Sequence, residues 1–170
     1  VGVQIVEQKG ALFYSFGWLL FLFLLSGCAA LIYQVVWQRT LFAVFGVNIE
    51  SVTVIVSVFM FGLGIGALLG GQLSERFVGR LPYLFMVCEL MIGLFGLVSL
   101  WLIHGVGEAT QGLGLVAVFL TTFALLCVPT ILMGATLPIL VAFLFAHFRQ
   151  VGRTVGLLYF ANTLGSAIAC

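Results

Sequence analysis

Few residues of this sequence could do acid–base or ion chemistry, and one of them, Glu89, stands deep inside an apolar run. It follows Pro82 by about seven residues, which on a helix is roughly 10 Å from the start of the run. An ionisable group at that depth in a membrane is expensive, so it is expected to face the interior of a helical bundle. Asn162 has a comparable depth in another apolar run and could hydrogen-bond to Glu89 if the two helices touch.

Two interpretations of Glu89 stay open. In the functional one, its carboxyl is a proton or cation site. In the structural one, it is a polar clamp, or an acid that the long side chains of Arg76 or Arg80 reach. The substitution Glu89→Gln separates them, because a proton-coupled site loses activity and a clamp keeps fold and assembly.

Further polar residues stand near the far end of the first apolar run. Gln34 and Gln38 are four residues apart and share a helix face, next to Arg39. Glu50 opens the second run on the same side, so it could pair with Arg39 at the rim. The candidate intramembrane polar site therefore comprises Glu89, Asn162, Gln34, Gln38 and Arg39.

No catalytic or metal-ligating pattern accompanies these residues. The sequence contains no Ser/His/Asp or Cys/His set and no phosphate loop, and its four cysteines are far apart without a C-x-x-C pair. His104 and His147 each lack a second ligand at metal spacing. We therefore expect no catalytic residue, cofactor, metal or disulfide framework in this chain.

Composition defines the class of protein. Hydrophobic residues make up 64% of the 170 residues and charged residues 6%, against about 45–50% and about 25% in soluble domains. Six Lys/Arg and five Asp/Glu cannot cover a water-exposed surface of this size. This excludes a water-soluble enzyme, a nucleic-acid binder and a disordered chain, and predicts an all-α polytopic membrane protein.

Five apolar runs are predicted to be transmembrane helices, because a span needs about 20 residues and helices satisfy their own backbone groups in lipid. They follow a short segment, 1–11, and lie at about 12–38, 49–73, 83–104, 114–146 and 153–170. The last run is still apolar at Cys170, so we expect the domain to continue beyond it.

The basic residues predict the orientation. If the spans alternate, one side carries Lys9, Arg76, Arg80, Arg149 and Arg153, and the other side carries Arg39 alone. By the positive-inside rule the amino terminus is predicted to be cytoplasmic. We expect the membrane to be a bacterial-type inner membrane.

The fourth run is too long for a simple crossing. At about 33 residues it would extend roughly 50 Å, against a hydrocarbon core of about 30 Å. Pro129 and Pro138 each remove a backbone donor, and Gly134 stands four residues before Pro138. These residues predict a broken helix; the alternative is a packing kink whose freed groups are satisfied locally.

Glycine spacing predicts close helix packing. Gly62, Gly66 and Gly70 recur every four residues in the second run, a spacing that lets two backbones approach in lipid. A second packing stripe is predicted on the fifth run, with Gly152, Gly156 and Gly165.

Two stretches resemble a known family. They are LSGCAALIYQVVWQR at 25–39, and the region from Pro129 through MGATLP (133–138) to Gly152-Arg153 and Asn162-Thr163-Leu164-Gly165. Both resemble the amino-terminal membrane domain of spermidine synthase-like (fused aminopropyltransferase-like) proteins. The resemblance implies a soluble enzyme domain after the membrane part, which would hold the catalytic acids; none of that chemistry falls on a residue of this chain.

The same membrane domain looks like part of a major facilitator bundle. GQLSER at 71–76, followed by Gly79-Arg80, is similar to that superfamily's cytoplasmic loop between its second and third helices, with Glu75 where Asp is usual and one extra residue. The resemblance implies a latch between helix ends, formed by Glu75, Arg76, Arg80 and Arg153.

Three functions remain open after the sequence. The first is a non-catalytic membrane module, an anchor or accessory subunit whose partners are the lipid bilayer and other membrane subunits. The second is half of a small-molecule or polyamine transporter. The third is the membrane part of an aminopropyltransferase.

Overall fold

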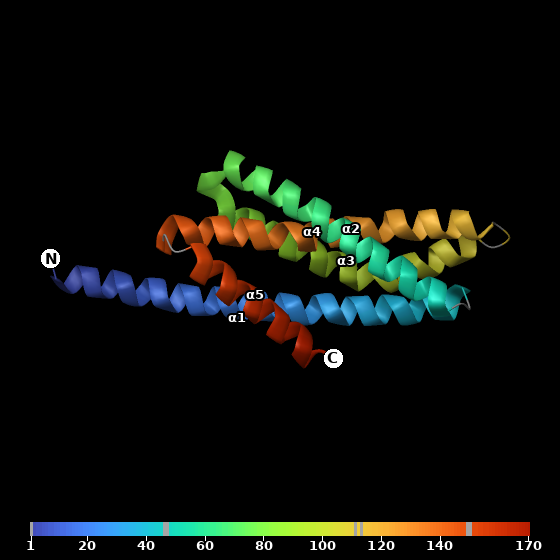
Figure 1. Ribbon diagram of the computed structural model, residues 1–170, viewed down its shortest axis with the longest axis horizontal. Coiled ribbons are helices and arrows are strands. Elements are labelled where there is room, and N and C mark those ends of the chain that lie inside the picture. Colours follow the sequence, from blue (N-terminus) through green and yellow to red (C-terminus); the bar gives the residue numbers. More distant parts are fainter. Residues whose placement is uncertain (1, 46–47, 111, 113, 149–150) are drawn as a thin grey trace. The chain divides into compact units, whose positions relative to one another are not determined.

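The computed structural model describes the backbone of residues 2–45, 48–110, 112, 114–148 and 151–170, and side chains over 17–43, 52–110, 112, 114, 116–145 and 152–170. Within these residues every regular element is a helix (Figure 1). In chain order they are α1 (Gly2–Phe45), α2 (Asn48–Arg76), the 3-10 helix η1 (Val78–Arg80), α3 (Leu81–Ala109), α4 (Leu115–Phe148) and α5 (Val151–Ile168). The predicted all-α class is confirmed.

Four of the described helical segments are long and apolar enough to cross a membrane. They are Gly17–Ala43, Val52–Arg76, Val78–Ala109 and Val116–Phe145, of 27, 25, 32 and 30 residues. Each exceeds the roughly 20 residues that a span requires. They overlap the first four predicted spans and confirm a polytopic membrane protein.

The fifth predicted span is a helix, but it is not among these four. α5 has 18 residues and includes Arg153, Asn162 and Ser166. It is therefore comparatively polar for a membrane crossing. At the other end of the chain, α1 is already helical from Gly2, within the segment predicted to precede the first span.

The outward faces of the helices are apolar. Leu97 on α3 is 83% exposed and Leu68 on α2 is 70% exposed, and large hydrophobic side chains are exposed on every helix. Soluble monomers rarely expose contiguous apolar surface on this scale. A lipid environment accounts for it, because lipid chains cover such faces without cost.

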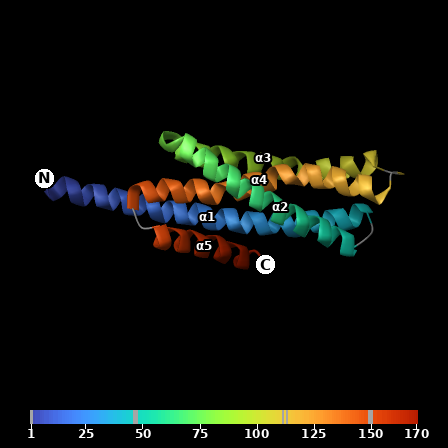
Figure 2. The ribbon, with the colours of Figure 1, turned by 45° about the horizontal axis from the view of Figure 1, so that its top comes forward.

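The chain divides into two compact units, and each is described by itself. Unit 1 comprises Val1–Ile32 and Gln150–Cys170, and unit 2 comprises Tyr33–Arg149. In unit 1, α5 lies alongside the first part of α1 (Figure 2). In unit 2, α4 packs against both α2 and α3, and α2 runs across α4 (Figure 1).

α4 is continuous from Leu115 to Phe148 although Pro129 and Pro138 lie inside it. The predicted break is therefore absent from the described part of this helix. Each proline removes one backbone donor, which would otherwise bond to the carbonyl four residues earlier, that of Leu125 for Pro129 and that of Gly134 for Pro138. Thr130, directly after Pro129, donates to the carbonyl oxygens of Leu126 at 2.9 Å and Cys127 at 3.0 Å. These bonds are made to carbonyls other than the two that the prolines free, and the helix is continuous through both prolines.

Candidate functional site

The predicted polar site is divided between the two units. Glu89, Gln34, Gln38 and Arg39 belong to unit 2, and Asn162 belongs to unit 1. The hydrogen bond between Glu89 and Asn162 therefore stays a prediction. Within the described residues, no group of three or more His, Cys, Asp or Glu side chains is placed to hold a metal ion.

Glu89 is half-buried on α3, directly after the buried Cys88. Its carboxylate lies within electrostatic range of the Tyr33 hydroxyl on α1 and of the Cys88 thiol. The expectation that Glu89 faces the interior of a helical bundle stays a prediction. Tyr33 is a neighbour that the sequence did not single out.

Near Tyr33, a buried tryptophan of α1 forms a hydrogen bond to α3. Trp37 is fully buried, and its indole N–H donates a hydrogen bond to Ser99 Oγ at 3.0 Å. Ser99 Oγ in turn donates to the carbonyl oxygen of Gly96 at 2.8 Å. An indole N–H buried without an acceptor is costly, so this pairing makes full burial of the ring possible.

Aromatic rings surround this tryptophan. Trp37 stacks on Tyr33 with ring centroids 5.2 Å apart, meets the ring of Phe95 edge-on at 5.8 Å and lies 6.1 Å from the ring of Phe59. A Cβ atom on Gly96 would collide with the phenol of Tyr33. We call Tyr33, Trp37, Phe59, Phe95, Gly96 and Ser99 the tryptophan cluster; it joins α1, α2 and α3.

The other polar residues of α1 lie near this cluster in sequence. Gln34 and Gln38 are half-buried, and Arg39 is exposed. The side chain of Glu50 lies outside the described residues, so the pair between Arg39 and Glu50 stays a prediction. The side chains of Lys9, Arg149 and His147 also lie outside the described part, and the cytoplasmic orientation of the amino terminus remains an expectation.

The glycines of the second predicted span lie directly against α4. A Cβ atom added to Gly66 would collide with the carbonyl oxygen of Ile131 and come within 2.8 Å of Gly134 Cα. A Cβ atom on Gly134 would lie 2.5 Å from the carbonyl oxygen of Leu63. Because these neighbours are backbone atoms, the two helices touch backbone to backbone. We call Gly62, Gly66, Gly70 and Gly134 the glycine seam.

The glycine seam continues on both sides of Gly66, at Gly62 and at Gly70. A Cβ atom on Gly62 would collide with the side chain of Thr130, and one on Gly70 would lie 2.6 Å from the carbonyl oxygen of Ala135 and 2.8 Å from Pro138 Cγ. Residue numbers increase in the same direction along both helices at these contacts, so the chain runs in the same direction in α2 and in α4. In lipid such contacts are stabilised by dispersion and by Cα–H···O interactions, since there is no hydrophobic force between helices.

Unit 1 has a smaller contact of the same kind. A Cβ atom on Gly165 of α5 would collide with the carbonyl oxygen of Leu24 on α1, and one on Gly27 would come within 2.7 Å of Asn162 Oδ1. Ser166 Oγ donates to the carbonyl oxygen of Gly27 at 3.0 Å. Asn162 therefore lies against α1 within unit 1.

The remaining glycines of the predicted stripe on α5 are not in contact. Cβ atoms added to Gly152 or Gly156 would meet nothing within 4 Å. The contact between α1 and α5 is made by Gly165 together with Gly27 and Ser166, two residues that the sequence analysis did not select. The only local signal for Gly27 was the run of small residues from Ser26 to Ala30.

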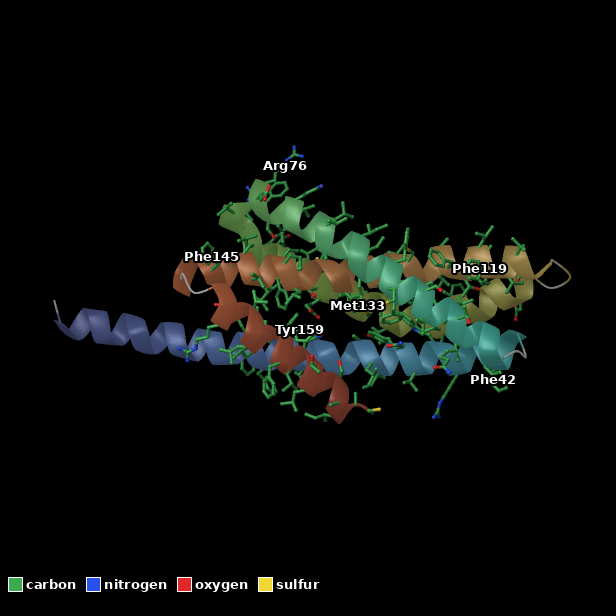
Figure 3. All side chains as sticks on the ribbon, viewed as in Figure 1. Phe42, Arg76, Phe119, Met133, Phe145 and Tyr159 are labelled. Atoms are coloured by element: carbon green, nitrogen blue, oxygen red, sulfur yellow. The ribbon has the colours of Figure 1, made fainter. Side chains whose placement is uncertain are left out.

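The residues of the predicted latch lie on the surface. In unit 2, Glu75 and Arg76 end α2 and Arg80 ends η1, and all three are exposed. Arg76 points away from the helices (Figure 3), with its guanidinium carbon 5.8 Å from the ring centroid of Phe77. Arg153 is exposed on α5 and belongs to unit 1. A latch between neighbouring helices stays a prediction.

These features define the class: an all-α polytopic membrane protein in which glycine contacts hold helices together and one half-buried acid lies within a span. In comparisons with known proteins, no family model, no curated protein and no solved structure matches the chain.

Proposed function

We propose that this chain is a non-catalytic integral-membrane module that acts as an anchor or accessory subunit of a larger membrane complex. The glycine seam is the observation that carries the proposal. It brings α2 and α4 to a separation that leaves no room for a single methyl group at Gly66, and this close contact favours a rigid pair. A scaffold that holds partners in place needs this rigidity.

The polar groups of unit 2 support the same function. The hydroxyls of Ser74, Thr130 and Thr136 donate to carbonyl oxygens of their own helices, and Trp37 bonds to Ser99 across helices. These groups are thus used to stabilise helices and their packing. The exposed helix faces are apolar and suit lipid or further transmembrane helices. The resemblance to the membrane domain of spermidine synthase-like proteins adds support for a membrane module.

Purification in mild detergent tests the proposal. The chain, extracted from its own membrane with an affinity tag, is expected to migrate with other membrane subunits in a complex of defined mass. Native mass spectrometry would identify the subunits and their stoichiometry. A stable monomer that carries lipid alone would contradict the accessory-subunit function.

Half of a transporter is the second candidate, and Glu89 favours it. Its carboxylate lies inside a span, within electrostatic range of the Tyr33 hydroxyl, and intramembrane acids often belong to ion or substrate pathways. The test is polyamine uptake into reconstituted vesicles with the wild-type chain and with Glu89→Gln. Uptake that is lost in the variant would establish transport, and vesicles without uptake would dismiss it.

The membrane part of an aminopropyltransferase is the third candidate, and it rests on the family resemblance alone. An intact-mass measurement of the native polypeptide is its test. A mass that leaves no room for a soluble domain would remove this candidate.

A further inference from the structure

The connection between α2 and α3 has a surface unlike the rest of unit 2. α2 ends at Arg76, η1 spans Val78–Arg80 and α3 begins at Leu81. Two backbone hydrogen bonds close the connection, from Phe77 N to the Leu73 carbonyl and from Arg80 N to the Phe77 carbonyl, both 2.9 Å. Residues 75–83, which we call the α2–α3 turn, therefore have a fixed backbone.

The position of this turn relative to the bilayer follows from its neighbours. The two segments that meet in the turn, Val52–Arg76 and Val78–Ala109, are both long and apolar enough to span a membrane. Because the turn is so short, it cannot extend far into water, so its residues lie at the level of the lipid headgroups.

The exposed side chains of the turn are of two kinds. Phe77, Val78 and Tyr83 are 40%, 63% and 67% exposed although they are large and apolar or aromatic. Arg76 and Arg80 are exposed beside them. The headgroup region favours this combination, since aromatic and aliphatic groups enter the lipid while arginines bind phosphate.

The charge of the turn is net positive. It contains Arg76, Arg80 and one acid, Glu75, whereas residues 81–148 contain no Lys or Arg and include Glu108 beside the α3–α4 connection. The basic character is therefore local to one end of α2 and α3. The buried side chains of Ser74 and Leu81 stand on the inner side of the chain there, which leaves the arginines directed outward.

We propose that the α2–α3 turn binds anionic phospholipids of the adjacent leaflet, with Arg76 and Arg80 as ligands of the headgroup phosphate. Phe77, Val78 and Tyr83 contact the acyl chains and the glycerol region. Two planar guanidinium groups provide paired donors that match phosphate oxygens, which a single amine does not. This interaction depends on the membrane placement of unit 2 and not on the accessory-subunit function.

Native mass spectrometry of the full chain in detergent, with equal amounts of phosphatidylglycerol and phosphatidylcholine, tests the proposal. The wild type is expected to retain phosphatidylglycerol preferentially. Each arginine at an anionic surface contributes about a fivefold preference, so Arg76→Gln with Arg80→Gln should weaken phosphatidylglycerol retention roughly 25-fold and leave phosphatidylcholine retention unchanged. Glu75→Gln should strengthen the preference.

Matched variants make the outcome decisive. Arg39→Gln removes one exposed arginine outside the turn and should weaken phosphatidylglycerol retention by at most about fivefold, well short of the double glutamine variant. Arg76→Lys with Arg80→Lys keeps both charges and should retain much of the preference. Unchanged phosphatidylcholine retention in the glutamine variant shows that this variant has not simply lost its fold. The proposal is overturned if the glutamine double variant still prefers phosphatidylglycerol, if Arg39→Gln has an equal effect, or if the variant loses an acidic protein partner while its lipids are unchanged.

Discussion

Substitution of Gly66 by alanine is the sharpest test of the glycine seam. The new methyl group would collide with the Ile131 carbonyl oxygen and approach Gly134 Cα within 2.8 Å. Both neighbours are backbone atoms, so the clash cannot be relieved by rotating a side chain. α2 and α4 must separate locally, and the contacts at the neighbouring glycines weaken with them.

The expected cost follows from two opposing terms. Overpacking a close contact costs about 1–3 kcal/mol, and each Cα–H···O contact that lengthens loses up to about 0.5–1 kcal/mol. Alanine regains up to about 1 kcal/mol of helix propensity over glycine. We therefore expect Gly66→Ala to lower the free energy of unfolding by about 2 kcal/mol, and Gly66→Leu to lower it further.

Gly64→Ala is the control on the same helix. A Cβ atom on Gly64 meets nothing within 4 Å, so this variant gains helix propensity without a clash. It should be as stable as the wild type or slightly more stable. The difference between the two alanine variants isolates the seam from the general effect of replacing a glycine.

The measurement is unfolding of the purified chain in mixed micelles as the fraction of denaturing detergent is raised, followed by circular dichroism. The midpoint for Gly66→Ala should fall clearly below that for Gly64→Ala. Equal midpoints would refute the backbone-to-backbone contact between α2 and α4. A lower midpoint for Gly64→Ala would refute the assignment of faces on α2.

Three further predictions concern other contacts. Ser99→Ala leaves the buried indole N–H of Trp37 without its acceptor and should destabilise the chain by about 1–3 kcal/mol; tryptophan fluorescence during unfolding measures it, and combining it with Trp37→Phe should recover part of the loss. Gly165→Ala should lower the thermal midpoint, because its methyl group would collide with the Leu24 carbonyl, whereas Gly156→Ala should not; equal midpoints would contradict the α1–α5 contact. Glu89→Gln should leave co-purification of partner subunits intact and change stability by less than about 1 kcal/mol; loss of the complex in this variant would show that the carboxylate contributes to assembly.

The sequence predicted the helices well because the bilayer sets their length and composition. Four apolar runs of sufficient length could be found without any knowledge of contacts. The predictions for α4 and α5 were less accurate. Prolines predicted a break in α4 because they remove donors, but the helix is continuous through Pro129 and Pro138, since the loss of single backbone bonds need not end a long apolar helix.

Contacts between helices were predicted only in part. The four-residue spacing of Gly62, Gly66 and Gly70 marks one face of a helix, and the structure places that face against α4. The same spacing at Gly152 and Gly156 leads to an open face, because spacing defines a face and not what covers it. The bond between Trp37 and Ser99 joins residues far apart in the chain, and neither has a local pattern that identifies the other.

The parallel register of α2 and α4 has a consequence for how the protein enters its membrane. The partner of Gly66 is synthesised only after all of α3, so the glycine face of α2 lacks its α4 partner until then. Glycines offer lipid chains little dispersion contact, and that face is therefore a poor match for its surroundings until α4 arrives. Insertion of α4 thus completes unit 2. A nascent chain that stops before α4 would leave the glycine face of α2 exposed, where it could pack against other transmembrane helices.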